Sequence, residues 1–214
     1  MKHMFGYMLI VIFILSVQPA NGQDRWVIGA GSAYQIPIGG LQDRFLPAFS
    51  TQVSAGRSAN EYWYWEVRGE YLVFDRENVE HISRDTLVLA DSISMDLELY
   101  GLGIEGRYHF FGRKGKGIIN PYMGLSAGMY RWFAERDAYN HEGINVPEFK
   151  QRDWSAGLGL GFGNEFLFLP FLSLSLDVRY HIVIGELWPT LSLGMESVGG
   201  FQTISASTRL RIYF

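Results

Sequence analysis

The feature that most constrains this chain is a two-residue alternation of apolar and polar side chains that recurs in eight segments. Alternate residues of a β-strand point to opposite faces, so this period predicts strands with one apolar face and one polar face. No segment keeps a 3.6-residue period, and the sequence therefore indicates an all-β protein. The eight segments cover residues 25–36, 48–57, 62–74, 95–111, 121–133, 153–166, 171–182 and 204–214.

The fourth segment has an irregular beginning. Leu97 and Leu99 fall out of phase with Tyr100, Leu102 and Ile104. This change of phase predicts either a β-bulge or a strand that continues beyond its regular part.

The connections between the segments alternate in length. Long connections are expected at 37–47, 75–94, 134–152 and 183–200, and short ones at 58–61, 112–120 and 167–170. Outer-membrane barrels pair long external loops with short periplasmic turns in the same way. The alternation predicts an antiparallel up-and-down meander.

The alternation alone does not say which face points inward, because a soluble barrel buries its apolar face and a transmembrane barrel turns that face to lipid. Segments of about 10–13 residues suit a tilted membrane-spanning strand. Aromatic side chains gather toward the ends of the apolar faces, as at a membrane boundary. The polar faces are mostly glycine and serine, which fit a narrow lumen. We therefore predict an eight-stranded antiparallel up-and-down transmembrane β-barrel.

The first residues predict export. Lys2 precedes an apolar run at residues 4–17, and the small residues Ala20 and Gly22 follow it. This order is typical of a secretory signal peptide, here residues 1–22, and leaves residues 23–214 as the barrel domain. The alternative is a membrane-anchoring helix, but the run is shorter than the ~20 apolar residues that a spanning helix needs.

Charge and cysteine content exclude several kinds of site. The chain has 214 residues and a formal net charge of −4, without the basic excess of a nucleic-acid-binding protein. It contains no cysteine, which excludes disulfides, thiolate metal ligands and cysteine nucleophiles.

The chain ends in the sequence LRIYF, at residues 210–214. Together with the exported eight-strand pattern, this ending resembles the barrel domain of the outer-membrane protein A family. The resemblance implies a location in the outer membrane, contact with its lipids, and recognition by the barrel assembly machinery through Leu210, Ile212 and Phe214.

Charged residues recur on the polar faces of four segments. They are expected to face the lumen and to pair there, because an unpaired buried charge is costly. We expect Glu66, Glu70 and Glu105 to meet Arg68 and Arg107, and Asp177 to meet Arg179, Arg209 or Arg211. Such a network is either a structural plug or the gate of a narrow pore. The predicted interior set is Glu66, Arg68, Glu70, Glu105, Arg107, Asp177, Arg179, Arg209 and Arg211.

The catalytic signals are weak. His81 and Ser83 form a His-x-Ser pair like that of one type of lipid-modifying barrel enzyme, but they lie in a predicted long loop. The other histidines lack metal-ligand spacing. The glycine-rich stretches at 101–106 and 157–163 do not open a helix and are not nucleotide loops. We assign no catalytic, metal or cofactor residue.

The long connections 75–94 and 134–152 are charged, and loops on a rigid scaffold commonly carry recognition. The sequence therefore favours a non-enzymatic outer-membrane barrel with a structural or surface-interaction role through these loops. A small gated pore is the alternative, followed by an enzyme that modifies lipid A.

Overall fold

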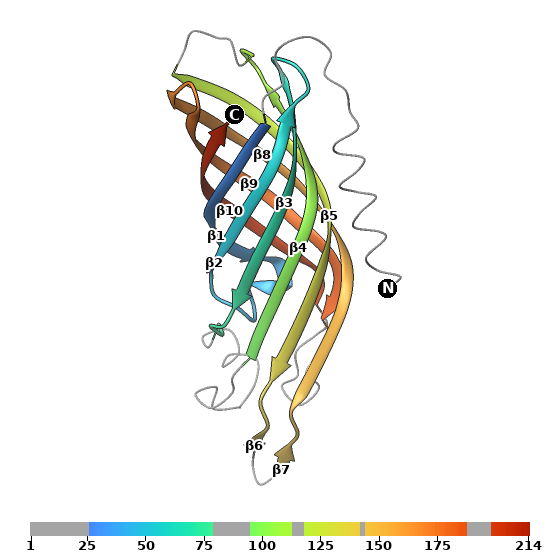
Figure 1. The fold of residues 1–214 in the computed structure, drawn as a ribbon. Helices are drawn as coiled ribbons and strands as arrows, with labels where there is room; N and C mark the ends of the chain where they lie inside the picture. The colour runs from blue at the N-terminus through green and yellow to red at the C-terminus, as the bar shows by residue number, and fades with distance from the viewer. Residues whose placement is uncertain (1–25, 79–94, 113–117, 142–143, 188–197) are drawn as a thin grey trace.

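The computed structural model describes residues 26–78, 95–112, 118–141, 144–187 and 198–214, which form β-strands almost throughout (Figure 1). Eight strands close into one antiparallel barrel in the order β1-β10-β9-β8-β5-β4-β3-β2. They are β1 (Trp26–Ile38), β2 (Ala48–Ser58), β3 (Trp63–Phe74), β4 (Met95–His109), β5 (Ile119–Arg136), β8 (Phe149–Leu169), β9 (Leu172–Leu187) and β10 (Val198–Tyr213). The predicted eight-stranded up-and-down barrel is confirmed.

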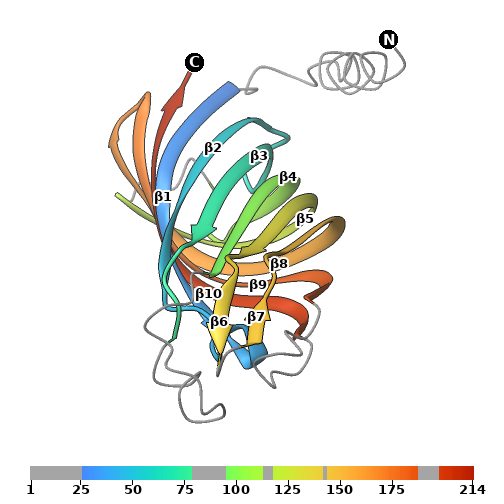
Figure 2. The ribbon, with the colours of Figure 1, turned by 90° about the horizontal axis from the view of Figure 1, so that it is seen from below.

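The barrel closes where the first strand meets the last. β1 pairs with β10 in continuous register from Val27↔Tyr213 to Ile38↔Gln202. Beyond that register, the backbone N–H groups of Trp26 and Phe214 each donate to the other residue's carbonyl at 3.0 Å. The closed ring is visible from the end that carries β6 and β7 (Figure 2).

The apolar residues of the alternating pattern lie on the outside of the barrel. Phe49, Leu125 and Leu158 keep 72%, 60% and 53% of their surface exposed, although each belongs to a paired strand. Aromatic pairs lie toward the two ends of this belt, including Tyr71 with Tyr100 at one end and Trp63 with Tyr108 at the other. An exposed apolar belt with aromatic margins is the surface that a membrane barrel presents to lipid.

The two ends of the barrel differ. One end carries the short turns 59–62, 110–118 and 170–171 together with the outer ends of β1 and β10. We call it the short-turn end. The other, the long-loop end, carries the connections 39–47, 75–94, 137–148 and 188–197. Within 39–47 lies the 3-10 helix η1 (Gly39–Leu41).

The expected loop at 134–152 is corrected by the structure. β5 and β8 stay paired as far as Arg136↔Phe149. Two short strands, β6 (Tyr139–His141) and β7 (Ile144–Val146), then pair with each other and continue the ribbon past the barrel (Figure 1). The predicted connection 183–200 is likewise shortened, because β9 runs to Leu187 and β10 begins at Val198.

The predicted bulge near Leu97 is wrong, and the strand-continuation alternative is right. β4 starts at Met95 and pairs with β3 and β5 without a register shift. Leu97 and Leu99 are buried inside the barrel, while Glu98 points outward and accepts hydrogen bonds from two tyrosine hydroxyls. The alternation is therefore intact, but in this part of β4 the apolar residues face inward, whereas further along the strand they face outward.

The same inversion occurs on β5. Met129 is exposed on the outer belt, whereas Trp132 and Ala134 are buried inside and Arg131 and Glu135 are exposed outside. A strand that leaves hydrocarbon meets water on its outer face, so polar residues belong there. The inversion marks the boundary of the apolar belt toward the long-loop end.

The inward apolar residues of this end pack into one cluster, which we call the apolar cap. η1 and the segment after it contribute Leu41 and Phe45, which are fully buried or nearly so. The cap comprises Leu41, Phe45, Leu72, Phe74, Met95, Leu97, Leu99, Tyr130, Trp132, Ala134, Val183 and Phe201.

The outer face predicts how the barrel responds to an added charge. Leu158→Arg places a cation in the middle of the belt, and the free energy of unfolding in lipid vesicles should fall by about 2–4 kcal/mol. Phe111→Arg, in the exposed turn after β4, should change it by about 0–1 kcal/mol. Tryptophan fluorescence during unfolding in urea measures both changes in the free energy of unfolding. Equal changes for the two substitutions would contradict a lipid-facing belt.

Candidate functional site

The lumen between the apolar cap and the short-turn end is the candidate functional site. All nine charged residues of the predicted set point into it, from β3, β4, β9 and β10. Eight of them are buried, and the Glu70 side chain is 8% exposed. Their burial follows from strand parity, since each lies an even number of residues from its charged neighbours on the same strand.

Glycines on the adjacent strands β5 and β8, directly paired with charged residues of β4 and β9, make room for these long side chains. A Cβ added at Gly124 would lie 3.0 Å from Glu105 Oε1, and one at Gly161 would lie 3.2 Å from Arg179 Nε. At Gly163 an added Cβ would come within 2.6 Å of the Asp177 Cβ. The glycine face of β8 is therefore a packing surface for the charges.

Glu66 is the first of two carboxylates that each join three or more arginines. Its Oε1 accepts from Arg107 Nη2 at 2.7 Å and from Arg209 Nη1 at 2.8 Å. Its Oε2 accepts from Arg211 Nη2 at 3.2 Å. Arg209 and Arg211 lie on β10, three strands from β3 around the barrel, so these bonds cross the lumen.

Glu105 is the second such carboxylate. Arg179 binds it with both terminal nitrogens, each at 2.8 Å, in the bidentate geometry that favours arginine–carboxylate pairs. Arg107 Nε and Arg68 Nη1 add bonds of 2.9 and 3.1 Å. Like Glu66, Glu105 ties strands from opposite sides of the barrel, because Arg179 lies on β9.

Asp177 connects the two centres. Its Oδ2 accepts from Arg209 Nη2 at 2.8 Å and from the Tyr122 hydroxyl at 2.9 Å, and its Oδ1 lies 3.4 Å from Arg179 Nη2. Of the three expected partners of Asp177, Arg179 and Arg209 thus meet it, whereas Arg211 pairs with Glu66 and Glu165. Pairs between neighbouring strands were predicted from the sequence, whereas the bonds across the lumen were not.

Glu70 stands apart from the arginines. Its closest guanidinium is Arg68, at 3.9 Å. Its Oε1 instead accepts from Gln35 and Gln52 amides and the Ser50 hydroxyl, at 2.8 to 3.0 Å. Neutral donors on β1 and β2 therefore satisfy this carboxylate.

Glu165 is a member of the network that the sequence analysis missed. It is fully buried near the short-turn end, where Arg211 Nη1 lies 3.5 Å and His109 Nε2 3.6 Å from its Oε2. The hydroxyls of Ser173 and Tyr213 donate to its Oε1. The signal was available, because Glu165 shares the inward parity of the glycines on β8.

The buried charges of this lumen balance. Five carboxylates (Glu66, Glu70, Glu105, Glu165, Asp177) face five guanidiniums (Arg68, Arg107, Arg179, Arg209, Arg211). Stacking adds to the packing, with the Arg107 guanidinium 4.7 Å from the Tyr122 ring centroid and that of Arg211 4.5 Å from the Tyr64 centroid. Such balance offsets the cost of removing ions from water.

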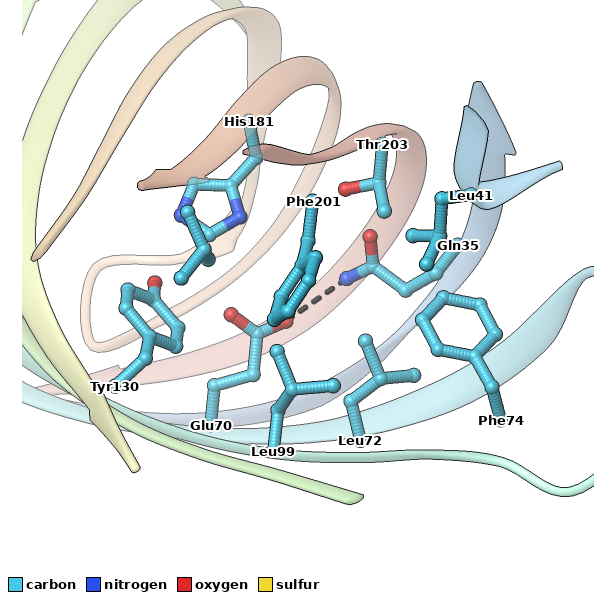
Figure 3. A pocket seen from close by; sticks show the side chains of 11 residues that line it. Gln35, Leu41, Glu70, Leu72, Phe74, Leu99, Tyr130, His181, Phe201 and Thr203 are labelled. Carbon is cyan, nitrogen blue, oxygen red and sulfur yellow. Dashed lines mark hydrogen bonds between the residues drawn. The ribbon is translucent and has the colours of Figure 1, made fainter. Parts of the chain in front are cut away.

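A small cavity lies between the charges and the apolar cap (Figure 3). Its volume of about 20 Å³ suits about one water molecule. Gln35 Oε1 and Thr203 Oγ1 line it and lack a hydrogen-bond partner among the described residues, so a water molecule there would satisfy both. Its polar lining includes Glu70, His181 and Tyr130, and its apolar lining includes Leu72, Leu99 and Phe201.

The structure describes only some of the residues in the catalytic and nucleotide motifs considered from the sequence. His81 and Ser83 lie outside the described residues. Both glycine-rich stretches lie in strands, β4 and β8. No group of three or more histidine, aspartate or glutamate side chains suited to a metal ion occurs in the part of the chain that the structure describes. No helix among the described residues is long and apolar enough to span a membrane.

Comparison with known proteins supports the fold through structure. No protein-family model matches the chain, and no curated protein matches it. The chain is similar to a major outer membrane protein from Thermus thermophilus, with a TM-score of 0.59 and 11% identity over 90% of this chain and 100% of that one. It is also similar to Neisserial surface protein A, with a TM-score of 0.55 and 18% identity over 88% of this chain and 97% of that one.

These similarities show the fold, that of a small outer-membrane β-barrel. The apolar belt provides the matching physical property, because a barrel with this exterior satisfies its backbone in lipid and covers the hydrocarbon with apolar side chains. The fold and the belt together place the protein in an outer membrane.

The network predicts a large difference between two Glu→Gln substitutions. Glu66→Gln leaves three buried guanidiniums short of a carboxylate and should lower the free energy of unfolding by about 3–5 kcal/mol. Glu135→Gln removes an exposed partner of Lys150, 3.9 Å away, and should cost about 0–1 kcal/mol. Unfolding of both variants in urea and lipid vesicles measures the difference, and similar values would contradict a structural network.

Proposed function

We propose that the protein is a non-enzymatic integral outer-membrane barrel whose lumen is structural and whose interactions take place at its long-loop end. The observation that carries this proposal is the filled lumen, in which a balanced set of ion pairs is followed by a cavity for about one water molecule and then by the apolar cap. Eight-stranded barrels have interiors just wide enough for side chains to fill.

The nine predicted interior residues, together with Glu165, act in this proposal as a plug. Each of the two central carboxylates holds arginines from strands on opposite sides, so the network links the walls of the barrel. A conducting gate would need these bonds to break and Leu97, Phe74 and their neighbours in the cap to separate.

The long-loop end supports the interaction role. The β5–β8 ribbon and its β6–β7 continuation extend beyond the barrel, and exposed polar residues of the ribbon include Glu135, Asp137, Glu148 and Lys150. A rigid scaffold that presents an extended polar ribbon is suited to recognition. The predicted interaction loop 75–94 lies almost wholly outside the described residues, while the described part of 134–152 forms this ribbon.

A conductance measurement separates the plug from the pore. Purified protein in planar bilayers should give no steady channels, with a porin as the positive control. The pore alternative would be supported instead by steady channels that Arg209→Ala abolishes, because that residue joins Glu66 and Asp177 across the lumen.

The terminal phenylalanine is proposed to act as an assembly signal read by the barrel assembly machinery, together with Leu210 and Ile212. The Phe214 side chain is 67% exposed, while its backbone takes part in closure, so its ring has little to stabilise in the finished barrel.

Phe214→Ala should therefore lower the amount of protein assembled in the outer membrane and leave the stability of refolded protein within about 0.5 kcal/mol of the original. Phe171→Ala, an exposed aromatic in the last short turn, is the matched control and should keep its assembly yield. Equal yields of the two variants in membrane fractions would contradict the assembly role.

A further inference from the structure

The outer face of β5 and β8 carries a cationic and aromatic patch at the boundary of the apolar belt toward the long-loop end. Its members come from two adjacent cross-strand pairs, Arg131↔Trp154 and Phe133↔Arg152. The next outward-facing pair toward the belt, Met129↔Ala156, belongs to the apolar exterior. We call these four residues the Arg131 patch: Arg131, Phe133, Arg152 and Trp154.

The Arg131 guanidinium lies over two aromatic rings. Its central carbon lies 5.0 Å from the Phe133 ring centroid and 5.6 Å from that of Trp154. Stacking uses the faces of the guanidinium plane and leaves its N–H edge to donate hydrogen bonds. The strand positions the cation before any ligand arrives, so little side-chain entropy remains to be lost.

Neither arginine of the patch is neutralised by a carboxylate within 4.0 Å among the described residues. Among the nearby acids, Glu98 accepts from the Tyr71 and Tyr100 hydroxyls at 2.7 and 2.6 Å, and Glu135 lies 3.9 Å from Lys150. Glu148 also lies near Lys150, at 3.7 Å. Two exposed cations on one face are therefore left facing the membrane boundary.

The position of the patch selects its ligand. On its belt side the outer surface is apolar, with Met129 51% and Leu158 53% exposed, and on its other side the ribbon is polar. An amphiphile with acyl chains along Met129 and Leu158 would have its headgroup at the level of Arg131 and Arg152. Arginine forms two parallel hydrogen bonds with a phosphate, and basic clusters beside a membrane surface attract anionic headgroups.

We propose that the Arg131 patch binds the phosphate headgroup of an outer-leaflet lipid. Arg131 and Arg152 donate to the phosphate oxygens, and Trp154 lies at the junction between headgroup and acyl chain. This inference rests on the proposed outer-membrane placement, and it adds a specific lipid contact to it.

The test uses full-length barrel refolded in a neutral detergent, with folding checked by its heat-sensitive migration on gels. Phosphatidic acid is the probe and diacylglycerol its phosphate-free counterpart, and native mass spectrometry measures the fraction of barrels that retain each lipid. The original protein should retain phosphatidic acid preferentially, and Arg131→Gln and Arg152→Gln should each reduce that retention by about tenfold.

Arg57→Gln is the matched control. Arg57 also lies on the outer face over an aromatic ring, 5.7 Å from the Trp26 centroid, but at the short-turn end. It should leave retention unchanged. Retention unaltered by Arg131→Gln and Arg152→Gln, or lost equally in Arg57→Gln, would overturn the proposal.

Inorganic phosphate added in excess distinguishes a site for a lipid phosphate headgroup from a site for free phosphate. Retention of phosphatidic acid in this excess supports a lipid site, and complete displacement by the phosphate overturns the proposal in favour of a site for free phosphate. A folded barrel without lipid preference would refute only this inference, whereas a chain that shows no folded barrel before lipid is added would refute the proposed function as well.

Discussion

The pairing of β1 with β10 is the interaction on which the rest of the structure depends. An open eight-stranded sheet would leave two rows of backbone donors and acceptors without partners, and hydrocarbon offers none. Closure removes both edges, down to the reciprocal bonds between Trp26 and Phe214. Once the ring is closed around a narrow interior, one face of every strand must meet lipid and the other must fill the lumen.

Ionised side chains rather than apolar ones fill that lumen because each strand has one face toward lipid and one toward the interior. An apolar lumen would leave both faces of each strand alike, and the two-residue period that specifies inside and outside would be lost. Charges keep the faces distinct, but they must balance and must reach one another. Arginine suits this role because its length and planar fork let Arg179 and Arg209 reach carboxylates across the barrel, while glycines such as Gly161 provide the space.

Strand parity made much of the fold and lumen predictable from the sequence, since every second residue shares an environment. It correctly placed the arginines of β10 inside and Leu158 outside. At Leu97 it left a bulge and a continuing strand as alternatives, because the change there is one of surroundings and not of backbone. The outer face enters water and the inner face enters the cap. The partner of each charge was also unpredictable, because Glu66 and Arg209 are brought together by the curvature of the closed ring, which the spacing of residues along the chain does not encode.

The inversion of the pattern on β4 and β5 also bears on where function can reside. On the belt side of the boundary, the charged side chains of the lumen pair with one another and the outer side chains face lipid. On the long-loop side, apolar residues turn inward to close the lumen, and the outer face of the ribbon is released for polar groups such as Arg131 and Arg152. The alternation of apolar and polar residues continues past the edge of the apolar belt with its faces exchanged. This exchange produces both the apolar cap inside the barrel and the charged exterior beyond the belt. The proposed interaction through the rim and the outer wall follows from this arrangement, because the charges of the interior are already engaged with one another.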